Sequence, residues 1–97
     1  MPNHNTHLIV KNAEGTSGLT TPDRRPWIDY WRAMTGNNRA TCARLGCSNQ
    51  VMVGAHVEFI DQRRSRNLYI VPLCSRCNNW RNREQMIIDS RTAVVEA

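Results

Sequence analysis

The sequence lacks any run of about eighteen apolar residues, and no apolar segment opens it. The first absence excludes a membrane-spanning helix, because such a helix needs about 20 mostly apolar residues in a row. The second absence removes the usual sign of export, so we expect a cytoplasmic, reducing location. Repeats and low-complexity segments are absent as well. The 97 residues therefore predict one small domain.

Aromatic residues and lysine are both scarce. Aromatic side chains make up 6% of the chain, so the core must be thin and a structural metal would supplement it. Of the 13 basic residues only Lys11 is a lysine. Arginine has a planar fork that suits phosphate and carboxylate groups, so this bias indicates recognition surfaces. An arginine-rich codon usage would give the same count.

The four cysteines form two close pairs, CARLGC at 42–47 and CSRC at 74–77. Each pair can wrap one edge of a tetrahedral zinc ion, and Gly46 and Pro72 suit the tight turns that this requires. Disulfides and unrelated thiols are the alternatives, and zinc is favoured where no export signal is present. Four thiolates and one Zn²⁺ would change the formal net charge of +5 to about +3. The predicted ligands are Cys42, Cys47, Cys74 and Cys77.

One amphipathic helix is expected in the N-terminal half, over Thr21–Gly36. Prolines fit its entry and Gly36 its end. Apolar residues at helical spacing, Trp27, Trp31 and Met34, form a stripe that we interpret as core, with a base-stacking platform as the alternative. A short strand over His7–Val10 and a loop over Lys11–Thr20 are expected before this helix.

A β-hairpin is predicted between the two cysteine pairs. Apolar residues alternate over Gln50–Ile60, a polar turn follows, and Asn67–Leu73 forms the second strand. The second cysteine pair is expected to open a helix through Glu84, whose positive end would favour thiolates. Two short strands follow, and one of them is expected to pair with the N-terminal strand. Their ranges are Met86–Asp89 and Ala93–Glu96.

The expected architecture is α+β. The order of zinc knuckle, hairpin and helix gives a zinc-stapled ββα core of the treble-clef type, with an N-terminal helix and short flanking strands. Residues 1–20 are assigned to an N-terminal tail, strand and loop, and residues 21–97 to a single zinc-binding domain.

The motifs around the cysteines resemble those of the HNH endonuclease superfamily. They are Cys-x4-Cys, GAHV at 54–57, NLYIVPLC and CSRCN, and they run from Cys42 to about Asn79. The resemblance implies that His56 is a general base, that Asn67 positions it, and that Asn78 binds a catalytic divalent ion such as Mg²⁺.

The chain departs from the active members of that family at Ala55, where they usually carry Asp, Glu or His as a metal ligand. The chain resembles small bacterial proteins with similar GAHV and YIVPLC segments more closely than it resembles the active nucleases. Glu58 lies on the same face as His56 and could replace the missing ligand, although a solvated strand residue is the simpler interpretation. His56 can equally be a hydrogen-bonded structural histidine.

Six arginines and no acidic residue lie between positions 63 and 83, which predicts a basic surface for phosphate contacts. An ordinary solvated surface is the alternative. These arginines are Arg63, Arg64, Arg66, Arg76, Arg81 and Arg83.

Three functions remain open. The favoured one is an HNH-like zinc module that binds nucleic acid and has an incomplete catalytic site. The others are a metal-dependent HNH endonuclease, and a structural or protein-interaction zinc domain.

Overall fold

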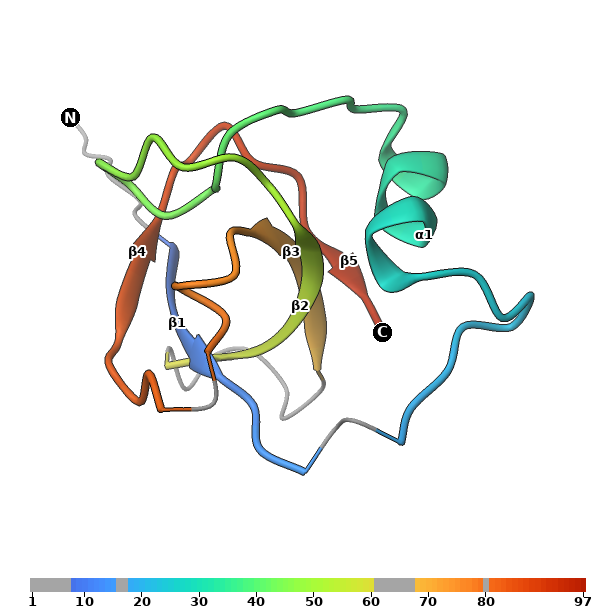
Figure 1. Ribbon diagram of the computed structural model, residues 1–97, viewed down its shortest axis with the longest axis horizontal. Coiled ribbons are helices and arrows are strands. Elements are labelled where there is room, and N and C mark those ends of the chain that lie inside the picture. The colour runs from blue at the N-terminus through green and yellow to red at the C-terminus, as the bar shows by residue number, and fades with distance from the viewer. Residues whose placement is uncertain (1–7, 16–17, 61–67, 80) are drawn as a thin grey trace, which may run out of the picture.

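Five antiparallel strands form one sheet in the order β4-β1-β2-β3-β5, and α1 packs against β2, β3 and β5 (Figure 1). The structure is a computed structural model that describes residues 8–15, 18–60, 68–79 and 81–97. The small α+β architecture expected from the sequence is confirmed. The elements are β1 (Leu8–Asn12), α1 (Trp27–Thr35), β2 (Val53–Phe59), β3 (Tyr69–Leu73), β4 (Met86–Ile88) and β5 (Val95–Glu96).

The β2–β3 hairpin at the centre of the sheet confirms the alternation in the sequence. Ala55 lies opposite Val71, and Val57 lies opposite Tyr69. Ala55, Val57 and Val71 are almost completely buried, because this face of the hairpin carries the main core. His56 lies opposite Ile70 on the other face, since successive side chains of a strand point to opposite sides.

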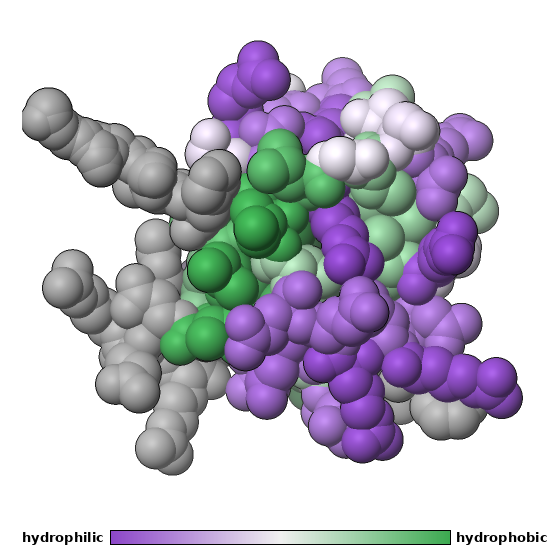
Figure 2. Space-filling model, turned by 90° about the vertical axis from the view of Figure 1, so that its left-hand side faces the viewer, coloured by the Kyte–Doolittle hydropathy of each residue, from purple (hydrophilic) through white to green (hydrophobic). Residues whose placement is uncertain are grey.

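The N-terminal strand β1 lies inside the sheet, between β2 and β4. Its pairing with β4 confirms the expectation that a C-terminal strand returns to it. Ile9 and Ile87 lie opposite each other in this pair and are 39% and 41% exposed. Leu45 is exposed too, and its N–H donates to the Ile87 carbonyl. Figure 2 shows apolar side chains gathered on this side, beside hydrophilic ones.

Helix α1 is shorter than predicted, because its first six expected residues form a turn. The Thr21 hydroxyl donates to the Arg25 carbonyl, Arg24 has a left-handed φ of 63°, and Pro26 is extended. A residue that precedes proline avoids the helical region, which delays the start to Trp27. Gly36 ends the helix in the left-handed conformation, as expected.

The expected apolar stripe of α1 is only partly buried. Trp31 is fully buried and donates from Nε1 to the Ala93 carbonyl. Trp27 is half-buried, whereas Met34 is 60% exposed. Within the described ranges no helix combines the length and the apolar character that crossing a membrane requires.

The helix predicted from the second cysteine pair through Glu84 is wrong for the described residues, which form turns between β3 and β4. Asparagines explain the difference. The Asn79 side chain accepts from the Arg81 N–H, and the Asn82 side chain accepts from the Glu84 N–H. Such local bonds offer the backbone an alternative to the helical ladder. The treble-clef and HNH-like core is therefore not confirmed.

Candidate functional site

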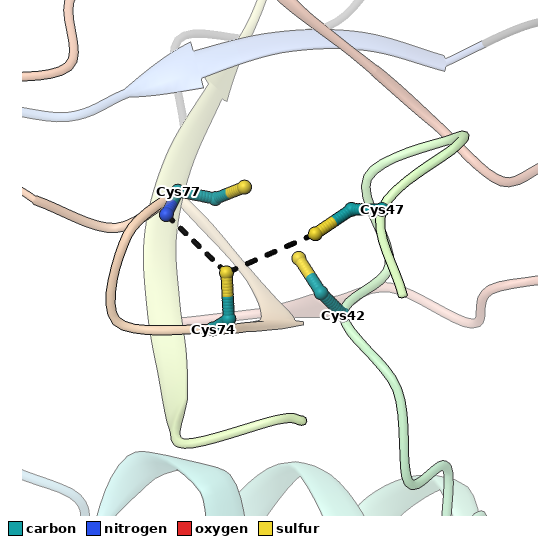
Figure 3. Close-up of side chains that lie close together, drawn as sticks. All are labelled: Cys42, Cys47, Cys74 and Cys77. Atoms are coloured by element: carbon teal, nitrogen blue, oxygen red, sulfur yellow. Dashed lines mark hydrogen bonds between the residues drawn. The ribbon is translucent and has the colours of Figure 1, made fainter. Parts of the chain in front are cut away.

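The four cysteines converge from two turns that are far apart in the sequence (Figure 3). Cys42 and Cys47 flank a turn in which Gly46 has a φ of 84° and the Cys47 N–H donates to the Arg44 carbonyl. Cys74 and Cys77 lie on the turn that follows β3. The first turn is held to the rest of the fold by the Ala43 N–H, which donates to the Pro72 carbonyl beside Cys74.

The sulfur atoms have the spacing of a tetrahedral metal site. All four lie within 4.8 Å of one another, and the Sγ atoms of Cys47 and Cys74 are 3.9 Å apart. A tetrahedron with Zn–S bonds near 2.3 Å separates its sulfurs by about 3.8 Å. The distance between Cys47 and Cys74 is far longer than a disulfide bond, and all four cysteines are free thiols. The donor set and its size therefore fit zinc.

Hydrogen bonds and burial shift the pKa values of the thiols in this cluster in opposite directions. Burial opposes ionisation of the Cys74 thiol, but the Cys77 N–H and the Asn49 amide donate to its sulfur and lower its pKa to about 6. Burial and the neighbouring Cys74 raise the pKa of Cys77 to about 12, and burial raises the pKa of Cys42. A metal must therefore displace protons from several thiols, so its affinity falls as the pH falls.

Arg44 supplies positive charge at the edge of the cluster. Its guanidinium is 3.0 Å from the Glu84 carboxylate, and its interactions with Glu84 and Cys77 raise its pKa. Four thiolates and one Zn²⁺ carry a net charge of −2, so a cation at this position offsets part of it. The sequence analysis missed Arg44, although it lies between the two cysteines of CARLGC.

A cavity of about 690 Å³ lies next to the cysteine turns, where β1 ends beside β2. Both His56 and Asn78 line it. The sequence analysis did not assign Lys11 or Leu19 to a site, because only the fold brings them there. The lining residues are Lys11, Asn12, Ala13, Glu14, Gly15, Leu19, Trp27, Gly54, Ala55, His56, Asn78, Asn82 and Arg83.

His56 is held against an aromatic ring. Its imidazole meets Trp27 edge-to-face with the ring centres 4.7 Å apart. Its Nε2 atom is buried and has no hydrogen-bond partner among the described residues. Burial lowers the pKa of His56, so the ring is neutral at pH 7. A neutral imidazole can accept a proton, but this nitrogen is closed to solvent.

The other positions of the expected catalytic site give no anionic metal ligand in the cavity wall. Ala55 is 2% exposed and belongs to the core. Glu58 does not line the cavity and lies opposite Lys11 in the β1–β2 pair. Asn67 lies outside the described residues.

Comparison of the chain with protein-family models, curated proteins and solved structures finds no match. The resemblance to HNH endonucleases therefore stays a prediction, and the functional argument depends on the geometry of the site.

The predicted arginines divide between two cavities. Arg83 lines the cavity beside His56. Arg76 and Arg81 line a second cavity of about 610 Å³ between the two cysteine turns, together with Arg44. Asn82 borders both cavities, so the turns after Cys77 separate them. The remaining arginines of the predicted surface, Arg63, Arg64 and Arg66, lie outside the described residues.

Proposed function

We propose that the protein is a zinc-stabilised module that binds nucleic acid through the arginines that follow its second cysteine pair. The cysteine cluster is the observation that carries this proposal. A metal held by two distant turns would fix the backbone between Cys74 and Cys77. Arg76 lies in this turn, and Arg81 and Arg83 follow it within six residues of Cys77. A fixed backbone lowers the entropy that these side chains lose when they bind a phosphate.

The charge of this segment supports the proposal. The side chains of Arg76 and Arg83 are exposed and have no ion-pair or hydrogen-bond partner among the described residues. Glu84 is the nearest acidic residue in the sequence, and Arg44 engages its carboxylate. The metallated chain keeps a net charge of about +3, which favours association with a polyanion.

The test is a salt titration of DNA binding with charge-matched variants. In the first variant Arg76→Gln and Arg83→Gln are combined. In the control, Arg24→Gln and Arg91→Gln make the same charge change at exposed positions outside both cavities. We expect the first variant to bind more weakly and to lose up to about 2 units from the slope of log K against log salt, while the control stays close to wild type.

Two results would contradict the proposal: no binding by the wild type at low ionic strength, or equal losses in both variants. An interaction domain would then be the better interpretation. The exposed apolar side chains Ile9, Leu45 and Ile87 favour that function as the surface of contact with another protein.

A metal-dependent nuclease is the second candidate, because His56 and Asn78 line one cavity. The incomplete ligand set argues for little or no cleavage, since Mg²⁺ binds through carboxylates and Asn78 offers only a neutral oxygen. We expect no nicking of plasmid DNA by the wild type with Mg²⁺ or Mn²⁺. Cleavage that disappears in His56→Ala would establish the nuclease instead. Adding a carboxylate by Ala55→Asp would mainly destabilise the fold, because this position is buried.

A further inference from the structure

We propose that the cavity beside His56 is a subsite for one unpaired nucleotide of a single strand. Its phosphate would lie at Lys11 and Arg83, and its base would lie against Trp27 with the Asn78 amide at its edge. This inference rests on the proposed nucleic-acid function and adds the form of nucleic acid that the protein prefers.

Two cations from distant parts of the chain meet at this cavity. Lys11 comes from β1, and Arg83 comes from the turn before β4. Both side chains are exposed, and neither side chain has an ion-pair or hydrogen-bond partner among the described residues. Among the described residues of the wall Glu14 is the only acidic one, so this part of the lining carries a net positive charge. Two unpaired cations at one cavity suit a phosphate group.

The apolar part of the wall is an aromatic ring in a fixed position. The Trp27 Nε1–H donates to the Leu19 carbonyl, and the ring meets Tyr30 and His56 edge-to-face at 5.3 and 4.7 Å between ring centres. Leu19 adds an apolar side chain that is 46% exposed. A ring that is already immobilised loses little entropy when a base stacks on it.

Three side-chain amides belong to the described part of the wall, and of these only Asn78 is available to a ligand. The Asn12 amide donates to the carbonyls of Cys77 and Asn82, and its oxygen is buried. The Asn82 amide donates to the Cys77 carbonyl and accepts from the Glu84 N–H. No side-chain bond of Asn78 exists among the described residues, so its donor and acceptor can pair with a base edge.

The size of the cavity favours a single strand. A volume of about 690 Å³ lies within the usual range for small-molecule sites, and it has room for one nucleotide. A base inside a duplex is stacked and paired, so it cannot enter without leaving the helix. The protein should therefore bind a single strand more tightly than the duplex of the same sequence.

The test compares a labelled single strand with its duplex by fluorescence anisotropy, using the zinc-loaded protein. Trp27→Leu removes the aromatic face and should weaken single-strand binding about tenfold, whereas Trp27→Phe keeps that face and most of the affinity. Asn78→Ala, at a half-buried turn position, is a second variant that should weaken binding if Trp27→Leu lowers the folded fraction. Met34→Ala is the control, since Met34 is exposed on the same helix outside the cavity.

A second measurement separates this inference from the proposed function. Adenosine monophosphate is titrated into ¹⁵N-labelled protein, and we expect shifts of the Trp27 indole N–H and the Asn78 amide signals. Equal binding of single strand and duplex, with Trp27→Leu and Asn78→Ala both like wild type, would overturn the subsite and leave the arginine surface intact. Binding of the nucleotide without binding of any longer nucleic acid would overturn the proposed function and leave the subsite intact.

Discussion

His56 is a titratable residue of the larger cavity, and its environment shifts its pKa. Burial against the Trp27 ring lowers its pKa below the ordinary value near 6.5. In the unfolded chain the imidazole is exposed and takes up its proton at higher pH. The unfolded state thus binds more protons as the pH falls below about 6.5, and the free energy of unfolding decreases there.

An NMR titration of the His56 ring signals measures this effect. We expect a midpoint below that of the same residue in urea-unfolded protein, and a smaller shift from the unfolded value in Trp27→Leu, which opens the packing around the ring. A midpoint equal to the unfolded value would show that the imidazole is solvated and that its packing against Trp27 is absent in solution.

At the residue scale, the sequence predicts those site residues that lie close to one another in the chain. Cys42 and Cys47 are five residues apart and Cys74 and Cys77 are three apart, so their spacing alone indicates a metal. Lys11 and Arg83 are 72 residues apart, and nothing near either one in the sequence marks it as part of a cavity. Their proximity depends on strand pairing, which no local pattern encodes.

At the element scale, local pattern predicts strands and fails where side chains compete with the backbone. The alternation over β2 follows from hydrophobic periodicity and is confirmed. The pairing of β1 with β4 agrees with the expectation that a C-terminal strand returns to the N-terminal one, although periodicity does not specify the partner. The segment after Cys77 has no strong helix breaker, yet asparagine side chains at 79 and 82 capture backbone N–H groups and hold it as turns. Residues of these turns line both cavities.

The contact between α1 and β2 depends on the absence of a side chain at Gly54. A Cβ atom there would lie 2.6 Å from the backbone of Trp27 and 2.6 Å from that of Ile28. Gly54→Ala must push the helix off the sheet, so we expect a loss of about 1–3 kcal/mol in the free energy of unfolding. Because Trp27 moves with the helix, single-strand binding should weaken too.

Urea denaturation monitored by circular dichroism checks the stability change. Gly18→Ala is the matched control, because a Cβ atom at Gly18 would have no neighbour within 4 Å. If Gly54→Ala unfolds at the same urea concentration as Gly18→Ala, the close approach of helix and strand is not present in solution.

At the scale of the whole molecule, the cysteine cluster is part of the hydrophobic core. Cys42, Cys74 and Cys77 are buried in the same cluster as the inner faces of β2 and β3. The turn that carries Cys42 and Cys47 also donates to the Ile87 carbonyl and accepts from the Asp89 N–H, which ties it to β4 and the residue after it. Because the same turn donates to the Pro72 carbonyl, loosening it disturbs both β4 at one edge of the sheet and β3.

Removal of the metal should accordingly unfold the molecule. Without zinc, the thiols stay in a small core, where burial and neighbouring cysteines raise the pKa of Cys42 and Cys77. The aromatic content is only 6%, so the core has few large apolar side chains to replace the cross-links that the metal provides. We expect a strong chelator to abolish cooperative thermal melting and added Zn²⁺ to restore it. Acidification should release the metal and unfold the protein with it, because protons compete for the thiolates.

Single-site variants test the same dependence without a chelator. Cys74→Ser removes one ligand and should lose the zinc and the cooperative transition together, as judged by native mass spectrometry and calorimetry. Ser75→Ala is the control, since Ser75 is exposed on the same turn between two ligands and offers no sulfur. A sharp melting transition in metal-free wild-type protein would show that the core folds alone. In that case the metal would serve only to fix the turns that carry the arginines, and nucleic-acid binding should still disappear on chelation.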